Sequence, residues 1–227
     1  MSGSFKVIRS STKSETEVSR RAKRAIVATR QERREPLPGD DIVPLPRSSY
    51  TLAVTIGAAR SEIWPWLVQM GQGRGGFYTH VWVERLLGAE IENADEILPE
   101  LQRLAIGDVV RLTPDPYRGH PGQYMTVAHL KPRRSLVFSQ TLPNGARATW
   151  AFVLRTAGVA TTRLLLRRRS ERPTWFDRVL HPGYLMMDAG VLRGLRKRAE
   201  AGARRARLTR VGLPVMRRRD EGDVRRP

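Results

Sequence analysis

The chain has 227 residues, enough for one domain with a sizeable core, and 40% of them are hydrophobic. It contains no cysteine, which excludes disulfides, thiol nucleophiles and cysteine-ligated zinc or iron–sulfur sites. No charge-free apolar run approaches the ~18 residues that a membrane span needs, and the N-terminal residues lack the apolar stretch of a secretory signal. We therefore expect a cytoplasmic protein with no transmembrane segment.

The formal net charge of +19 is concentrated at the two ends of the chain. Residues 1–47 hold 11 Lys and Arg against 6 Asp and Glu, and residues 193–227 hold 13 against 4. Two interpretations remain open. The basic ends make weak electrostatic contacts with nucleic acid or anionic lipid, or they are solvated tails that aid solubility. The second is favoured because no nucleic-acid-binding signature accompanies the charge.

Composition divides the chain into three parts. Residues 1–47 predict a basic, disordered tail followed by a proline-rich linker, because proline fixes φ and lacks a backbone donor. Residues 48–207 carry the periodic apolar patterns of one folded domain. Residues 208–227 predict an arginine-rich, disordered C-terminal tail.

The first periodic element is a strand over residues 50–56, where apolar side chains occupy every second position. A helix should follow, with Ser61 as its N-cap. Its apolar positions keep helical spacing: Ile63, Trp66, Leu67 and Met70. The glycine-rich residues 71–76 end this helix, and the apolar run from Phe77 predicts a second short helix.

Five further strands are expected at residues 109–112, 124–130, 134–141, 148–155 and 160–169. Apolar side chains alternate with arginines in the last of them, which is typical of an antiparallel sheet with one wetted face. A long amphipathic helix over residues 175–206 follows, with Pro182 as a candidate break. This helix is long enough to cover the apolar face of the sheet. The order of elements therefore predicts an α+β helix-grip fold, in which a curved antiparallel sheet wraps around a long C-terminal helix.

Five segments of the chain carry a resemblance to a known family. They are Trp64-Pro65-Trp66-Leu67-Val68-Gln69-Met70-Gly71-Gln72-Gly73-Arg74, Gly76-Phe77-Tyr78, Glu84-Arg85-Leu86-Leu87-Gly88, Pro99-Glu100-Leu101-Gln102 and Gly107-Asp108. Together they resemble START-like proteins of actinobacterial type, in the SRPBCC or Bet v 1-like superfamily of polyketide cyclases and lipid-transport proteins. The similarity extends over roughly residues 48–200 and implies the same helix-grip fold. One position departs from the pattern, because Val81 stands where an acidic residue is expected before Trp82.

The resemblance implies an internal cavity that binds a small hydrophobic ligand, lipid-like or polyketide-like, without a cofactor. Pockets of this kind are mostly apolar with a few polar groups. The candidate lining residues are Trp66, Met70, Phe77, Tyr78, Trp82, Phe138, Trp150, Phe152, Met186 and Met187. Ordinary core packing is the alternative for each of them.

A cyclase-like or dehydratase-like enzyme using the same cavity is the second hypothesis. His80, Tyr78 and Arg74 are then the candidates to donate protons or to orient a substrate. The histidines show no helical metal-ligand spacing, so no metal site is expected. The glycine-rich loop lacks the Lys-Ser/Thr ending of a phosphate-binding loop. We therefore favour non-catalytic ligand binding, with the enzyme and a surface binder acting through the basic termini as alternatives.

Overall fold

The structure is a computed structural model that describes residues 25–79, 93–113, 123–142, 144–172 and 175–210, with only the backbone of residues 175–180 and 210. The described helices are α2 (Arg30–Arg34), α3 (Arg60–Val68), the short 3-10 helix η1 (Pro99–Leu101) and α5 (Trp175–Arg210). The described strands are β1 (Ser48–Ile56), β2 (Val109–Arg111), β3 (Tyr124–Lys131), β4 (Ser135–Thr141), β5 (Arg147–Gly158) and β6 (Thr161–Ser170).

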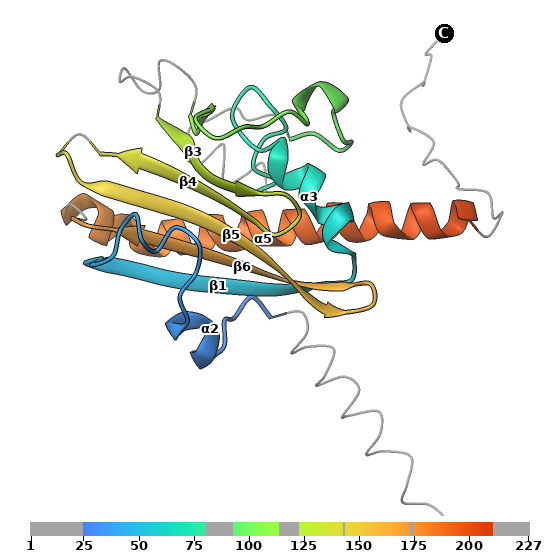
Figure 1. The fold of residues 1–227 in the computed structure, drawn as a ribbon, viewed down its shortest axis with the longest axis horizontal. Helices are drawn as coiled ribbons and strands as arrows, with labels where there is room; N and C mark the ends of the chain where they lie inside the picture. The colour runs from blue at the N-terminus through green and yellow to red at the C-terminus, as the bar shows by residue number, and fades with distance from the viewer. Residues whose placement is uncertain (1–24, 80–92, 114–122, 143, 173–174, 211–227) are drawn as a thin grey trace, which may run out of the picture.

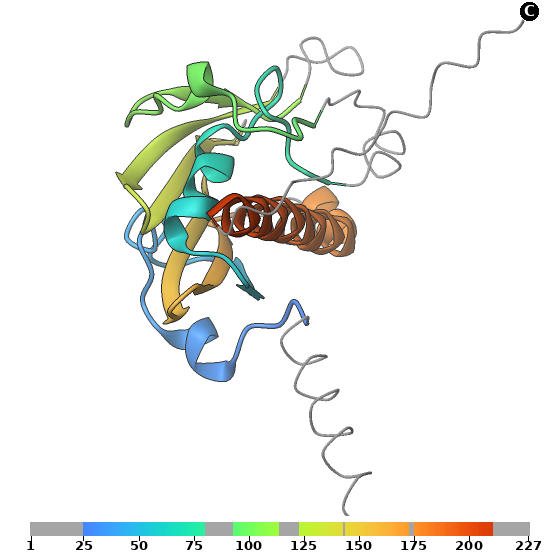
Figure 2. The same ribbon diagram turned by 90° about the vertical axis from the view of Figure 1, so that its right-hand side faces the viewer.

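These six strands form one antiparallel sheet in the order β1-β6-β5-β4-β3-β2. The first strand lies beside the last, so that Ser48 pairs with Ser170 and Ile56 with Thr162. The register shifts between Val127 and His129, and again between Thr156 and Gly158. Bulges of this kind bend a strand and increase its twist. The sheet is accordingly curved, and it wraps around one side of α5 (Figures 1 and 2).

Helix α5 lies along the concave face of the sheet and runs through Pro182 without a break. Its buried hydrophobic residues keep helical spacing and are Val191, Leu192, Leu195, Ala199 and Ala203. They join the inner side chains of the sheet and of α3 in one hydrophobic core. The helix-grip fold predicted from the order of elements is therefore confirmed.

Helix α3 begins two residues before the position that the sequence predicts, because its N-cap is Ala59 and not Ser61. Arg60 is its first residue, and the N–H of Ala59 donates to the Glu62 carboxylate at 2.6 Å. Ser61 lies in the first turn and is not the N-cap. A loop closed by a bridge between Gly71 and Gly76 follows, and both glycines have positive φ, which a residue with a Cβ rarely adopts. The second short helix expected after Phe77 falls mainly on residues 80–92, which lie outside the described part of the chain.

Residues 25–47, which we call the outer strap, differ most from the expectation of disorder and a free linker. They contain α2 and lie on the convex face of the sheet, opposite α5 (Figure 2). Ala28 and Leu37 of the strap pack with Ala53, Val153 and Leu165 in a second, smaller apolar cluster. The strap thus covers part of the face that the sequence predicts to be wetted.

Arginines of β6 hold the outer strap in place. The guanidinium of Arg167, 3% exposed, donates to Asp40 at 2.6 Å, to the Glu32 carbonyl at 2.8 Å and to Thr51 Oγ1 at 2.9 Å. Arg163 donates to both carboxylate oxygens of Glu32, at 2.8 and 2.9 Å. Two-point bonds between charged partners are among the strongest hydrogen bonds in proteins. These arginines therefore add charged hydrogen bonds to the apolar contacts of Ala28 and Leu37, and the two together hold the strap on the sheet.

Candidate ligand-binding site on the concave face

Four neighbouring strands each place one side chain in a row across the concave face. Tyr50 of β1 pairs with Arg168 of β6, Arg168 with Trp150 of β5, and Trp150 with Phe138 of β4. Side chains alternate between the faces of a sheet, so these four point to the same side, towards α5. The next row towards Ile56 is apolar and consists of Leu52, Leu166, Phe152 and Leu136. The face thus changes from apolar to mixed at the Tyr50–Phe138 row.

Trp150 lies at the centre of an aromatic group. Its ring centroid is 4.8 Å from that of Phe152 and 6.0 Å from those of Phe138 and Phe77. The ring planes are tilted to one another, as the charge distribution of aromatic rings favours. All four side chains belong to the main core. They form a large apolar surface at the edge of the mixed row.

A buried polar cluster adjoins this aromatic surface. Asp188 of α5 is fully buried and accepts hydrogen bonds from Arg168 Nε at 2.7 Å and Arg168 Nη2 at 3.0 Å. The hydroxyl of Tyr50 donates to the same carboxylate at 2.8 Å. A buried carboxylate is tolerated only when its charge and its lone pairs are satisfied. The cluster therefore fixes α5 against β1 and β6 at this point.

Arg168 connects the polar cluster to the aromatic one. Its guanidinium carbon lies 4.4 Å from the centroid of the Trp150 ring, within range of a cation–π interaction. Burial opposes the charge of Arg168, but the nearby Asp188 carboxylate and Tyr50 leave its pKa above the ordinary value. Burial, with the help of Asp188, raises the pKa of Tyr50. Arg168 therefore stays charged and Tyr50 stays protonated at neutral pH.

Two polar atoms on this face are buried without a hydrogen-bond partner among the described residues: Trp150 Nε1 and Ser170 Oγ. Trp150 pairs with Arg168 and Ser170 with Ala148, so the two side chains are diagonal neighbours on the same face. A buried polar group without a partner costs roughly 1–3 kcal/mol, and such groups are rare in folded proteins. A hydrogen-bond acceptor lying beside both would satisfy two donors at once.

Seven of the ten predicted lining residues lie together in the main core: Trp66, Met70, Phe77, Tyr78, Phe138, Trp150 and Phe152. Met187 is only partly buried, and Met186 is 45% exposed, so Met186 does not face the sheet as predicted. The reason is helical phase, because Asp188 faces the sheet and two residues along a helix correspond to a rotation of about 200°. Trp82 falls outside the described residues.

The candidate catalytic residues do not form an acid–base group in the described structure. The Tyr78 hydroxyl donates to the Trp66 carbonyl at 2.8 Å, and burial raises the pKa of Tyr78. Arg74 donates to the carbonyl oxygens of Val68 and Leu101, at 3.2 Å each. Both side chains thus hold backbone around the glycine-rich loop. His80 lies outside the described residues.

The polar cluster itself was not predicted as a site, although the sequence contains signals for two of its members. In β6, Arg168 lies two and four residues after Leu166 and Leu164, so its side chain points to the same face as these apolar residues. Asp188 stands four residues before Leu192, on the apolar side of α5. An ionisable residue in a buried register position is the pattern to look for, but the identity of its partner follows only from the pairing of β6 with β1 and α5.

No cluster of three or more His, Cys, Asp or Glu residues that could hold a metal ion occurs within the described ranges. The helices described here include none that is both long and apolar enough to cross a membrane.

Neither a family model nor a curated protein matches the chain. Among solved structures, protein MLL2253 from Mesorhizobium loti is 17% identical, with 70% of this chain and 98% of that one covered and a TM-score of 0.40. A point mutant of norcoclaurine synthase from Thalictrum flavum, in complex with a transition-state analogue, is 14% identical. The match covers 67% of this chain and 93% of that one, with a TM-score of 0.41. CalU16 from Micromonospora echinospora is 16% identical, with 69% and 86% covered and a TM-score of 0.37. Similarity at this level carries no inference about what the protein does, and the actinobacterial START-like assignment stays a prediction.

Proposed function

We propose that the protein binds a small, largely apolar ligand between the concave face of the sheet and α5, and that it does so without catalysing a reaction. The observation that carries the proposal is the pair of buried, unpartnered groups among the described residues, Trp150 Nε1 and Ser170 Oγ, beside the aromatic group. An apolar ligand with one acceptor oxygen matches this combination. Its body would contact the aromatic rings, and its oxygen would accept from the two donors.

Binding is favoured over turnover because the ionisable groups at this site are already engaged. Both oxygens of Asp188 accept hydrogen bonds from Arg168 or Tyr50, so the carboxylate is occupied by the protein's own donors. The pKa of Tyr50 is raised, which makes its hydroxyl a donor and disfavours its anion. These side chains are suited to shaping a site and holding its charge constant.

A cyclase-like or dehydratase-like enzyme remains a second candidate, since ionisable side chains do lie on the concave face. In that case the Tyr50 hydroxyl, which donates to Asp188 at 2.8 Å, would turn from this carboxylate and give its proton to the substrate, leaving a phenolate beside the Arg168 charge. Replacing Tyr50 by Phe separates the two candidates. The variant keeps the ring and should still bind ligand, whereas an enzyme that used the hydroxyl would bind and fail to convert its substrate.

The direct test is a titration of the full-length protein with Nile red, an uncharged apolar dye that carries a carbonyl acceptor. We expect saturable binding with a fluorescence increase. The variant Trp150→Phe keeps an aromatic ring but lacks the indole N–H, and it should bind about threefold to tenfold more weakly, which is the contribution of one hydrogen bond. Native mass spectrometry of the purified protein should also reveal a bound small molecule.

The matched control is Trp64→Phe, which makes the same chemical change on α3. Trp64 is only partly buried and lies at the margin of the core, so the variant should bind the dye as the wild type does. The proposal is wrong if the wild-type protein binds no dye and carries no small molecule, or if the two tryptophan variants weaken binding equally.

A further inference from the structure

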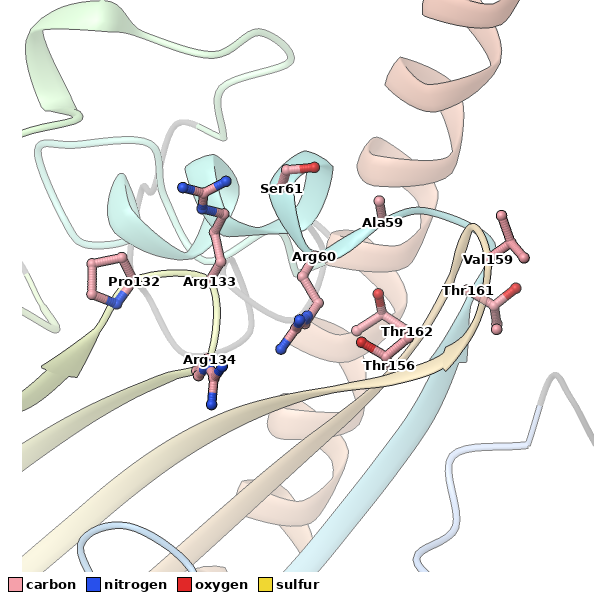
Figure 3. A pocket seen from close by; sticks show the side chains of 11 residues that line it. Ala59, Arg60, Ser61, Pro132, Arg133, Arg134, Thr156, Val159, Thr161 and Thr162 are labelled. Carbon is pink, nitrogen blue, oxygen red and sulfur yellow. The ribbon is translucent and has the colours of Figure 1, made fainter.

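A pocket lies at the other end of the sheet from Asp188, outside the core. Its volume is about 470 Å³, and it is formed by the start of α3, the turn between β3 and β4, and the hairpin between β5 and β6 (Figure 3). This volume falls in the range of small-molecule sites. The proposed apolar site does not include it, so whatever it binds is a separate property of the protein.

The described lining of this pocket is basic and contains no carboxylate. Arg60 reaches from α3 towards the strands, and Arg133 and Arg134 extend from the turn on the other side (Figure 3). None of the three forms an ion pair or a side-chain hydrogen bond with a described residue. The nearest acidic residue in the sequence of α3, Glu62, is engaged by the Ala59 N–H at 2.6 Å. Three uncompensated cations around one hollow favour a multiply charged anion.

The pocket also supplies donors without charge. Arg60 and Ser61 are the first two residues of α3, and the N–H groups at the start of a helix have no partner within it. Thr156 and Thr161 line the hairpin side (Figure 3). The hydroxyl of Thr162 is not free for a ligand, because it donates to the Ala58 carbonyl at 2.8 Å.

The turn that carries two of the arginines holds an unusual backbone conformation. Arg133 has φ 59, in the left-handed region that residues with a Cβ avoid. The turn is closed by the Arg134 N–H, which donates to the Lys131 carbonyl at 2.9 Å. Conformations of this kind persist where the surroundings impose them, and they are frequent at ligand-binding positions. Glycine would suit this position better, yet the chain has an arginine there.

We propose that this pocket binds a phosphate group carried by a small molecule. A phosphate monoester has about two negative charges and three acceptor oxygens, which matches three guanidinium groups with hydroxyl and backbone donors nearby. A carboxylate, with one charge and two oxygens, would leave most of this basic lining uncompensated. The phosphate could belong to a soluble metabolite or to a lipid headgroup, and the two sources share the same recognition chemistry.

The test uses the full-length protein and two forms of the phosphate group. Calorimetric titration with glycerol 3-phosphate measures the soluble form. Co-sedimentation with phosphatidylcholine vesicles, with and without phosphatidic acid, measures the same phosphate on a membrane. The key variant is Arg133→Gly, which removes a pocket charge while giving the turn the residue that its φ favours. Its melting temperature should equal or exceed that of the wild type, and its affinity for phosphate should fall about tenfold.

Lys131→Ala is the matched control, because it removes a positive charge from the same turn without touching the described lining of the pocket. It should bind phosphate as the wild type does. Arg134→Ala is a second pocket variant and should lose affinity like Arg133→Gly. Binding in the soluble arm that depends on Arg133 and Arg134 supports a metabolite, and binding in the vesicle arm alone with the same dependence supports a lipid headgroup. The absence of binding in both arms, or equal losses in the Arg133, Arg134 and Lys131 variants, would overturn the proposal.

Discussion

Arg168 and Asp188 form a two-point ion pair that joins β6 to α5, with Nε and Nη2 lying 2.7 and 3.0 Å from the carboxylate oxygens. The Asp188 side chain is fully excluded from solvent, and the side chain of Arg168 is 21% exposed. The pair lies between the aromatic group and the hydroxyl of Tyr50. It therefore determines both how α5 sits on the sheet and where the concave face becomes polar.

Replacing Asp188 by Asn should destabilise the fold strongly. The substitution keeps the size of the side chain but leaves the Arg168 charge without its partner, which for a buried pair costs roughly 3–5 kcal/mol. Urea denaturation followed by circular dichroism measures the loss in the free energy of unfolding. A loss below about 1 kcal/mol would mean that the pair is solvated and does not fix α5.

The double variant Arg168→Met with Asp188→Leu tests the same pair by removing both charges together. Removing both charges avoids an uncompensated ion, and apolar replacements of a buried pair are often close to neutral. The double variant should therefore be more stable than Asp188→Asn alone. If it were less stable, the arginine would contribute mainly through contacts other than its ion pair.

Replacing Arg167 by Met should release the outer strap. The guanidinium of Arg167 bonds Asp40 and three carbonyl oxygens of the strap, those of Glu32, Arg33 and Glu35. We expect a loss of about 3 kcal/mol in the free energy of unfolding, and faster trypsin cleavage within α2, identified by the mass of the fragments.

The control for the strap is Arg155→Met. Arg155 also bonds the strap, through Glu35 at 2.6 Å, but its side chain is 39% exposed. An exposed ion pair contributes less than about 1 kcal/mol, so α2 should stay protected from trypsin in this variant. Equal effects of the two substitutions would show that the strap is not held by its buried arginine.

The attachment of the strap should weaken in acid. The hydrogen bond from Arg163 is the largest cause that lowers the pKa of Glu32, from 4.5 to about 2. A carboxyl with a lowered pKa in the folded state contributes its stabilisation above the unfolded value of 4.5, and this contribution disappears as the pH falls from about 4.5 towards 2. Urea denaturation at several pH values gives the free energies of unfolding of the wild type and of Glu32→Gln. These free energies should converge as the pH falls through this window. A difference in the free energy of unfolding that stays constant down to pH 2 would contradict the ion pair with Arg163.

Two glycines of α5 should respond in opposite ways to alanine. A Cβ at Gly194 would collide with the carbonyl of Tyr78, whereas a Cβ at Gly202 would meet nothing within 4 Å. Gly194→Ala should force α5 away from the backbone at Tyr78, at a cost of roughly 1–3 kcal/mol. Gly202→Ala should stabilise the helix by about 0.5–1 kcal/mol. Thermal denaturation of both variants measures the contrast, and a loss in each case would show that helix propensity does not decide the result at Gly202.

The strands of the sheet were predictable within one to three residues because alternation is a local property. The strand predicted at residues 134–141 is observed as Ser135–Thr141, and the one at 160–169 as Thr161–Ser170. The long helix was predictable because the helical spacing of its apolar residues is also a local property. Its continuity through Pro182 was not, since the sequence around that proline contains only the signal for a break.

The outer strap could not be predicted because its order depends on distant partners. Arg163 and Arg167 bond strap residues that lie 127–136 positions earlier in the sequence, and the composition of residues 25–47 gives no sign of such contacts. The polar cluster of the site is a similar case. Alternation in β6 predicts the face on which Arg168 lies. Its pairing with Asp188 depends on the rotation of α5 about its axis, and this rotation also places Met186 towards solvent.

A crystal structure of the full-length purified protein would show whether a ligand acceptor lies against Trp150 Nε1, as proposed. We expect density for a non-protein molecule on the concave face, with an acceptor atom about 3 Å from Nε1. Density showing that Nε1 donates to another atom of the protein, or to a single water, with no ligand beside the aromatic group, would contradict the proposal.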